Sequence, residues 1–222
     1  MIIEKYFPQY SDEWWLARRG RFGASEATPI RVAGAGLKNL AHRKAFELSI
    51  ASDELYLQWL QRDRQYKSEQ MDMGSANQLF AKENAEIILG KKIREIGICL
   101  YGDWACFSPD GRIDEWNCGA EIKNIDSPTG QEKYLLASQG AFDKLDDYDQ
   151  IQYSLALSGW DFWLYILYSE VLFGETPQIF KIERDNRLIM PFLRGLVTGK
   201  NILVKRLTEY ATAREKGVNY EQ

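Results

Sequence analysis

The sequence predicts a mixed α and β domain in which helices flank one central mixed β-sheet. Three observations lead to this fold class. Apolar residues recur at helical spacing through most of residues 1–90, short segments rich in β-branched and aromatic residues follow from Ile93, and a long amphipathic stretch closes the chain. With 222 residues, 45% of them hydrophobic and 27% charged, the composition is that of a globular protein, and we expect a single domain over 1–222.

The first part of the chain, 1–90, is expected to be mostly helical. Ser11 to Arg19 is predicted as a short helix closed by Gly20, and Ser25 can cap the helical turn that follows. Helical spacing of apolar residues predicts three more helices, at 37–49, 54–65 and 77–89. The apolar residues near one face of the last helix are Leu79, Phe80, Ile87 and Ile88.

The sheet core is expected at about 91–184 and a terminal helix at about 185–216. Turn residues separate predicted strands at 93–101, 104–108, 111–115 and 119–124. A helix is predicted at 143–158, an entirely apolar strand at 162–168, as for a strand covered on both faces, and another strand at 178–183. Asp185 is the predicted N-cap of the terminal helix, whose apolar stripe consists of Leu188, Ile189, Phe192, Leu193, Leu196, Ile202, Leu203 and Leu207.

The charge balance excludes a protein that coats nucleic acid nonspecifically, because such binding depends on clustered lysine and arginine. The net charge is −4 and the pI is about 5.3. An enzyme acting on nucleic acid must then concentrate its positive charge locally. The candidate clusters are Arg18, Arg19 and Arg21, then Lys91, Lys92 and Arg94, and finally Lys200, Lys205 and Arg206.

Cysteine content and hydropathy indicate the cellular compartment in which the protein is expected. Cys99, Cys106 and Cys118 are an odd number without C-x-x-C spacing, so we expect three packed, reduced thiols and neither a disulfide framework nor a zinc ribbon. No apolar run approaches the roughly 20 residues of a membrane helix. The N-terminus lacks a basic region followed by an apolar stretch, and we expect a cytoplasmic protein without membrane contact.

Two carboxylates and a lysine on a predicted hairpin carry the candidate chemistry. Asp110 lies at a strand bend and Glu121 on the next paired strand, so a hairpin can bring both side by side. Oxygen ligands favour a hard ion such as Mg²⁺ or Mn²⁺. Lys123 follows two residues after Glu121 and therefore projects to the same face, where its ammonium can orient a water or offset phosphate charge. Taken alone, this spacing also fits a hairpin with scattered surface charges.

Further motifs in the same chain help to interpret the spacing of Asp110, Glu121 and Lys123. In order along the sequence they are Trp14 to Arg18 with Gly20, Gly23-Ala24-Ser25-Glu26, Gly74, Ser108-Pro109-Asp110-Gly111, Glu121-Ile122-Lys123, and Gln150-Ile151-Gln152-Tyr153-Ser154. In order, spacing and total length the chain resembles the PD-(D/E)XK nucleases, specifically the lambda exonuclease or YqaJ viral recombinase group of phage alkaline exonucleases.

This resemblance implies a restriction-endonuclease-like core and a metal-dependent exonuclease. Such an enzyme degrades one strand of linear double-stranded DNA, 5′ to 3′, from a 5′-phosphorylated end in phage-type recombination. By the resemblance, Asp110 and Glu121 bind Mg²⁺, for which Mn²⁺ substitutes, the backbone carbonyl of Ile122 joins them, and Lys123 is catalytic. It also implies a ring-shaped homotrimer around DNA and a single-strand annealing protein as partner.

The resemblance further assigns Arg18, Ser25 and Gln152 to the terminal 5′-phosphate. These residue types suit that role, because arginine offers a planar fork of donors to phosphate oxygens, and hydroxyl and amide groups complete a cradle. Taken one at a time, they are also compatible with a surface charge, a helix cap and a solvated helix residue.

Gln78 departs from the family pattern, which has an acidic residue four positions after the glycine matched by Gly74. A carboxamide oxygen can coordinate a metal or its water, but it should hold a second cation less well. Alternatively Glu83 or Glu86 serves, or Gln78 faces solvent.

Two other functions stay open. One is a sequence- or structure-specific endonuclease on the same fold, and the other is a catalytically silent DNA-binding module. An iron–sulfur nuclease is disfavoured because four cysteine ligands cannot be assembled from three.

Overall fold

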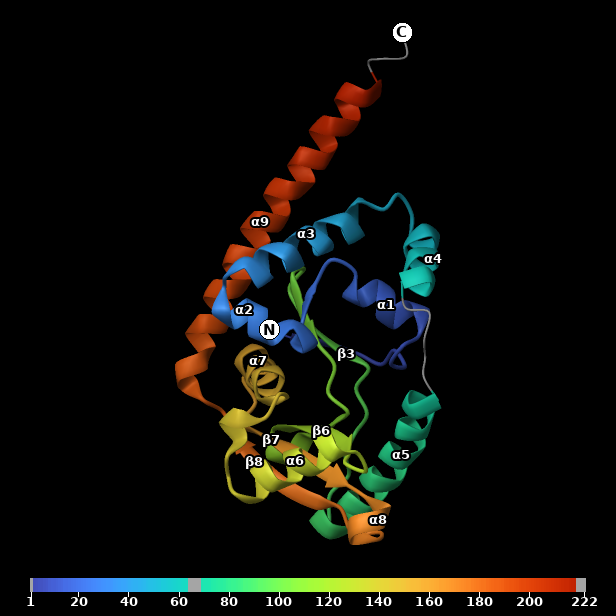
Figure 1. The fold of residues 1–222 in the computed structure, drawn as a ribbon, viewed down its shortest axis with the longest axis vertical. Coiled ribbons are helices and arrows are strands. Elements are labelled where there is room, and N and C mark those ends of the chain that lie inside the picture. The colour runs from blue at the N-terminus through green and yellow to red at the C-terminus, as the bar shows by residue number, and fades with distance from the viewer. Residues whose placement is uncertain (1, 64–68, 219–222) are drawn as a thin grey trace.

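The computed structural model describes residues 2–63 and 69–218, and it has the mixed α and β class predicted from the sequence (Figure 1). The strands are β1 (Ile2–Lys5), β2 (Phe22–Gly23), β3 (Ile98–Tyr101), β4 (Ala105–Phe107), β5 (Gly111–Ile113), β6 (Cys118–Asn124), β7 (Phe162–Tyr168) and β8 (Gln178–Glu183). The helices are α1 (Asp12–Arg18), α2 (Ala27–Val32), α3 (Ala35–Ser49), α4 (Asp53–Asp63), α5 (Glu69–Leu89), α6 (Pro128–Ser138), α7 (Tyr148–Ser158), α8 (Glu170–Phe173) and α9 (Asn186–Val218).

The strands form two four-stranded mixed sheets, and the chain passes from one to the other between β4 and β5. The first sheet has the order β1-β3-β4-β2 and the second β5-β6-β7-β8. Pro109, in the connection, has no N–H to extend the ladder of the first sheet, whereas the Asp110 N–H donates to the Ala120 carbonyl at 3.0 Å. The strands that were predicted to form one sheet are therefore divided between two sheets. Asp110 lies where the chain passes from the first sheet to the second.

The parallel pair β6 and β7 forms the buried centre of the second sheet. β7 is buried along nearly its whole length, as predicted for a strand covered on both faces. α5 packs against this pair through Ala81 and Ala85, which are fully buried. Small alanines let the helix approach closely, and the apolar stripe predicted for it faces outward instead. Its exposed members are Leu79, Phe80, Ile87 and Ile88.

The long helix α9 packs against α2, α3 and α7. Its start is capped as predicted, since the Asp185 carboxylate accepts a hydrogen bond from the Arg187 N–H at 2.9 Å. Gly195 permits a close crossing, because a Cβ there would lie 1.9 Å from the Ile30 carbonyl oxygen. The predicted stripe of α9 contributes Phe192, Leu196 and Leu203 to the core. α9 therefore holds α2 and α3 in place beside the segment that carries Ser25.

Several elements differ from those predicted. β1 and β2 fall within the range expected to be mostly helical, and α6 and α8 were not predicted. The helical turn predicted after Ser25 is present in α2, but Ser25 does not cap it, because its hydroxyl accepts from Arg18 instead. The start of α6 carries a clear signal in Ser127, whose hydroxyl accepts from the Gly130 N–H at 3.1 Å, followed by Pro128 in the first turn. The helix predicted at 143–158 begins only at Tyr148. The predicted end of the helix 54–65, at Gln65, lies outside the described residues.

All three cysteines are free and buried, which confirms the predicted packed thiols. Burial raises the pKa of the Cys118 thiol to about 11, so this side chain stays protonated at neutral pH. Across residues 2–63 and 69–218, no helix has the length and apolar character needed to cross a membrane.

Candidate active site

The candidate active site is built on the β5–β6 hairpin. Residues 118–120 of β6 pair with β5, but β6 continues to Asn124. Beyond Ala120, the backbone groups on this side of β6 can therefore form hydrogen bonds with side chains. The Ile122 N–H donates to Asp110 Oδ2 at 2.7 Å. The N–H and carbonyl of one strand residue point to the same side, so the Ile122 carbonyl is directed toward Asp110 as well. The hairpin thus brings Asp110 and the predicted backbone ligand together.

Glu121 and Lys123 project from the same face of β6, as the period of two predicts. Their side chains are joined by an ion pair of 2.7 Å between Lys123 Nζ and Glu121 Oε1. Glu121 is only 4% exposed, and it also accepts a hydrogen bond from Gln150 Nε2 of α7 at 2.9 Å. Gln150 therefore orients the carboxylate. Gln150 belongs to the motif Gln150-Ile151-Gln152-Tyr153-Ser154, but the sequence pattern alone does not indicate this role.

A second carboxylate, Asp147, lies on the other side of Lys123. Its Oδ1 is 3.9 Å from Lys123 Nζ. Its Oδ2 accepts from Lys133 Nζ at 2.6 Å and from the Tyr165 hydroxyl at 2.7 Å. The lysine thus lies between two carboxylates, and one of them is held by a buried network. Sequence reasoning missed Asp147, because its partners come from three separate elements, α6, β6 and β7.

Burial dominates the electrostatics of this cluster. Desolvation raises the pKa of Glu121 to about 7, with Lys123 opposing the shift and Asp110 adding to it. Desolvation also raises the pKa of Asp110, against the attraction of Lys123 and the Ile122 N–H. The pKa of Lys123 lies above its usual range, because Glu121, Asp147 and Asp110 outweigh its own desolvation. Two adjacent carboxyls are therefore costly to ionise in the absence of a further cation.

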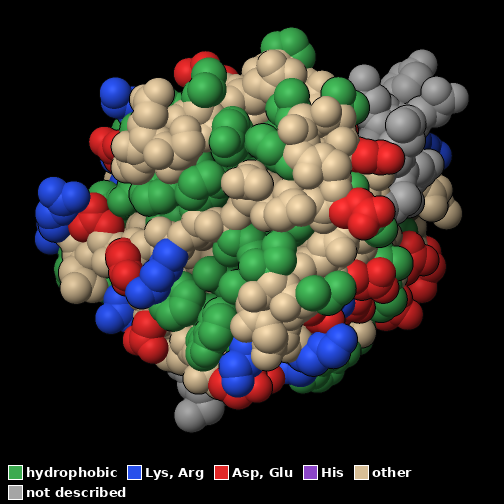
Figure 2. Space-filling model, turned by 90° about the horizontal axis from the view of Figure 1, so that it is seen from below, with side chains coloured by type: hydrophobic (Ala, Val, Ile, Leu, Met, Phe, Trp, Pro, Cys, Tyr) green, Lys and Arg blue, Asp and Glu red, His purple; other side chains and the backbone are tan. Residues whose placement is uncertain are grey.

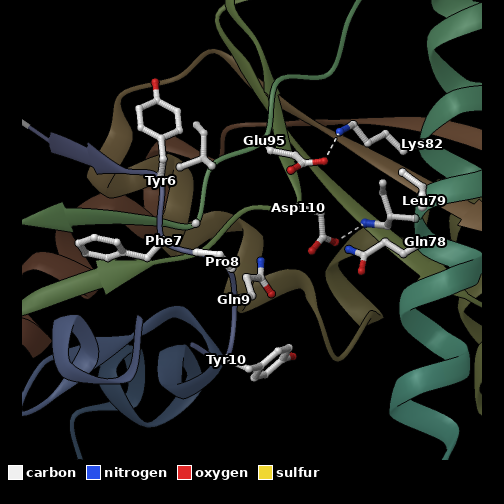
Figure 3. Close-up of a pocket in the computed structure, with 13 residues that line it drawn as sticks. Tyr6, Phe7, Pro8, Gln9, Tyr10, Gln78, Leu79, Lys82, Glu95 and Asp110 are labelled. Atoms are coloured by element: carbon white, nitrogen blue, oxygen red, sulfur yellow. Dashed lines mark hydrogen bonds and ion pairs between the residues drawn. The ribbon is translucent and has the colours of Figure 1, made fainter. Parts of the chain in front are cut away.

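A cavity of about 390 Å³ opens beside Asp110. Its walls come from residues 6–10, from α5 and from the hairpin (Figure 3). Gln78 of α5 lies next to Asp110 and is hydrogen bonded to it, which stabilises the ionised carboxylate. Among the other candidates on this helix, Glu83 is exposed, and Glu86 binds Lys92 Nζ at 2.6 Å. Of the three, the structure brings Gln78 to the site.

The donor set at this cavity suits a hard cation. The described residues contain no group of three or more His, Cys, Asp and Glu side chains able to hold a metal ion. The candidate ligands are instead the Asp110 carboxylate, the Ile122 carbonyl and the Gln78 amide, which line the cavity, and the carboxylate of Glu121, which precedes Ile122 on β6; each can offer an oxygen atom. A divalent cation held by these residues would offset the two desolvated carboxylates.

A second cavity, of about 250 Å³, contains two of the predicted phosphate ligands. Arg18 donates from Nη2 to the Ser25 hydroxyl at 3.3 Å. Its guanidinium lies 4.5 Å from the ring centroid of Trp14. Other charges in the cavity are compensated: Arg43 and Lys44 pair with Glu26 and Glu47.

Trp14 links this cavity to the hairpin. Its indole N–H is within hydrogen-bonding distance of the Gly97 carbonyl at 2.9 Å and of the Ser108 hydroxyl at 3.0 Å. Ser108 stands two residues before Asp110 in the chain. The ring beneath Arg18 is therefore anchored to the segment that carries Asp110, so the two regions are held together.

The third predicted phosphate ligand, Gln152, lies elsewhere. It is 1% exposed, its Nε2 donates to the Glu183 carbonyl at 2.8 Å, and its Oε1 accepts from the Asp185 N–H at 2.7 Å. The amide therefore ties α7 to the start of α9. Both ends of the amide are thus occupied within the protein, and neither is available to bind a phosphate.

The remaining basic clusters are largely offset by acidic neighbours. The ion pairs include Arg19 with Asp53, Lys91 with Glu115, Lys92 with Glu86, Arg94 with Asp114, and Arg206 with Glu209. These side chains form ion pairs within the chain, whereas Arg18 contacts the neutral Ser25 hydroxyl and the Trp14 ring.

The fold defined by these elements is that of the phage-type exonucleases. The crystal structure of an alkaline exonuclease, LHK-Exo, from Laribacter hongkongensis matches with a TM-score of 0.69 and 20% identity, over 95% of this chain and 100% of the other. The same enzyme in complex with dAMP gives a TM-score of 0.70. A phage-related exonuclease from Haemophilus somnus 129PT matches with a TM-score of 0.58 and 12% identity, over 86% of this chain and 96% of the other. No protein-family model and no curated protein matches the sequence.

Proposed function

We propose that this chain is a Mg²⁺-dependent 5′-to-3′ exonuclease of the PD-(D/E)XK superfamily, in the lambda exonuclease or YqaJ group. It would degrade one strand of linear double-stranded DNA from a 5′-phosphorylated end in phage-type homologous recombination. The observation that carries the proposal is the cluster of half-buried Asp110, buried Glu121 and half-buried Lys123 beside an open cavity. The fold shared with solved exonucleases supports it.

The residues of the cluster divide the chemistry between them. When bound, Mg²⁺ or Mn²⁺ would polarise a phosphoryl oxygen and lower the pKa of its water. Asp110, Glu121 and the Ile122 carbonyl would hold the cation, and Gln150 keeps the Glu121 carboxylate in its orientation. Lys123, placed between Glu121 and Asp147, stabilises negative charge on the phosphate or orients the attacking water.

The cavity that contains Arg18 and Ser25 supports the proposed 5′-to-3′ direction of digestion. Arg18 supplies a planar set of donors and Ser25 a hydroxyl, both at the wall of a cavity large enough for a phosphate group. A terminal 5′-phosphate held there would place the first phosphodiester near the carboxylates, since Trp14 joins the two regions. An internal phosphodiester has no terminal phosphate to bind in this way.

A gel assay on linear duplexes tests both parts of the proposal. The purified protein is incubated with duplexes that carry a 5′-phosphate or a 5′-hydroxyl, with Mg²⁺ or with EDTA. We expect Mg²⁺-dependent release of nucleotides from the phosphorylated 5′ end, loss of activity in Asp110→Ala and Glu121→Ala, and loss of the phosphate preference in Arg18→Ala. Arg62→Ala, which removes an exposed arginine of α4, is the matched control.

Other outcomes of this assay favour the alternative functions. Cleavage of a circular duplex would indicate an endonuclease on the same fold. DNA binding without hydrolysis under any metal would indicate a catalytically silent module. Near-wild-type activity of Asp110→Ala would remove the assigned catalytic site.

We further propose that the protein forms a ring-shaped homotrimer around DNA and acts with a single-strand annealing protein. The net charge of −4 supports a ring, because topology can retain DNA where ion pairs are few. Exposed apolar side chains on α5 and α8 are available for contacts between copies: Leu79, Phe80, Ile87, Ile88, Val171 and Leu172. Hydrophobic side chains are spread over the face seen from below in Figure 2, at the end of the molecule where Figure 1 shows these helices. Light scattering that gives a monomer would contradict the ring.

A further inference from the structure

The walls of the two cavities meet at a pair of aromatic side chains. Tyr10 lines the cavity beside Asp110, and Trp15 lines the cavity that contains Arg18. The centroids of the two rings are 6.1 Å apart, and the Tyr10 ring is also 5.3 Å from that of Trp14. An aromatic surface therefore extends from the carboxylates to the proposed phosphate site, which is where the nucleotide between them must lie.

Tyr10 is held in an unusual backbone conformation. Its φ of 69° lies in the left-handed region, which is costly for a bulky side chain. The neighbouring backbone enforces it, because the Ser11 N–H donates to the Pro8 carbonyl at 3.1 Å and the Ser11 hydroxyl caps α1. The resulting ring is 44% exposed, although an apolar ring would gain from burial. A strained residue that presents an exposed ring beside a cavity is typical of a ligand site.

We infer that Tyr10 forms the stacking surface for the base of the terminal nucleotide, whose 5′-phosphate lies at Arg18 and whose 3′ phosphodiester lies at Asp110. This inference rests on the proposed function. Aromatic rings bind bases through stacking without regard to sequence, because every base has a π face. A subsite of this kind suits an enzyme that must remove any nucleotide in turn.

Tyr6 offers a matched comparison. It lines the same cavity from the same segment and is 66% exposed, but its hydroxyl accepts a hydrogen bond from Arg94 at 2.8 Å. In Figure 3 the ring of Tyr6 lies above Asp110 and the ring of Tyr10 lies below it, at opposite ends of residues 6–10. Of these two tyrosines, Tyr10 is the one whose ring contacts Trp14 and Trp15, which lead to Arg18.

Binding of two mononucleotide probes tests the subsite without hydrolysis. The probes are dAMP and its baseless counterpart 2-deoxyribose 5-phosphate, titrated calorimetrically in the presence of Mg²⁺. We expect the wild type to bind dAMP roughly tenfold more tightly, within the range that stacking of one base provides. Tyr10→Phe should keep this ratio and Tyr10→Leu should bring it close to one. Tyr10→Asn is a second ringless variant, since asparagine tolerates the left-handed region and preserves the fold.

The controls separate the subsite from the proposed activity. Tyr6→Leu should leave the ratio unchanged, and Arg18→Ala should weaken both probes to a similar extent. Equal affinity of the wild type for both probes, absence of dAMP binding, or an unchanged ratio in the ringless variants would overturn the inference. A normal ratio in a protein that shows no Mg²⁺-dependent hydrolysis would refute the proposed function and leave the base subsite standing.

Discussion

Replacing Glu121 by glutamine should change how the stability of the metal-free protein depends on pH. Glu121 is buried beside Lys123 and Gln150, and desolvation is the main reason that its pKa rises to about 7 in the folded protein. The Glu121→Gln variant keeps the shape of the side chain and an oxygen that can accept from Gln150. It removes the titration of this one carboxyl.

The sign and size of the effect follow from linkage. The ordinary pKa of a glutamate is 4.5, so between pH 4.5 and about 7 the folded protein binds a proton that the unfolded chain has released. The free energy of unfolding therefore falls as the pH rises through this window and levels off above it. At about 1.4 kcal/mol for each pKa unit, the fall due to Glu121 is about 3 kcal/mol. For a chain of this size that corresponds to a decrease in Tm of about 6 to 12 °C.

Thermal unfolding in EDTA at a series of pH values from 5 to 8 measures the effect. We expect the wild type to lose stability over this range and Glu121→Gln to lose less of it by about 3 kcal/mol. Added Mg²⁺ should raise the wild-type Tm more at pH 8 than at pH 5.5, because the ligand must be ionised to bind metal. Parallel pH profiles for the two proteins would refute the assignment of a raised pKa to Glu121.

Three further predictions concern single positions. Gln78→Glu should lower the Mg²⁺ concentration needed for half-maximal activity by between about 10- and 100-fold, because it adds a charge at the metal site; an unchanged metal titration would place Gln78 outside it. Asp147→Asn should reduce kcat by roughly 10- to 100-fold with little change in KM, because the lysine of β6 loses its second anchor; an equal effect on KM would point to substrate binding instead. Gly97→Ala should destabilise the protein by more than about 3 kcal/mol in urea unfolding, since its Cβ would lie 1.7 Å from the Phe7 carbonyl oxygen. Gly34→Ala, where the nearest atom is 3.9 Å away, is the control and should cost about 1 kcal/mol or less; similar losses in both would contradict the steric argument.

The parts of the site that could be predicted from sequence are those set by local geometry. The period of a strand places Glu121 and Lys123 on one face, and the structure joins them by an ion pair of 2.7 Å. Arg18 and Ser25 were assigned to one site only by the family resemblance, and the structure joins them by a hydrogen bond of 3.3 Å. Asp147 could not be found in this way, because its contacts depend on the packing of distant elements.

The same distinction applies to the fold. The cap at Asp185 and the buried strand β7 follow from short sequence patterns and are confirmed. The inner face of α5 was mispredicted, because hydrophobicity favours its large apolar residues whereas the small Ala81 and Ala85 are the fully buried ones against the sheet. The division into two sheets depends on how the chain turns at Pro109, which periodicity does not describe.

The pairing of β1 with β3 has a consequence for how the protein matures. Lys5 pairs with Ile98 and Ile2 with Tyr101, so β1 has no partner until synthesis has passed β3. Helices α2 and α3 pack against α9, so they also lack their main support until the end of the chain has been made. Closing so long a loop is slow. Residues 6–10, which follow β1, supply one wall of the cavity beside Asp110. The emerging chain therefore holds no finished site, and any DNA-degrading activity arises only after the first strand has found its place.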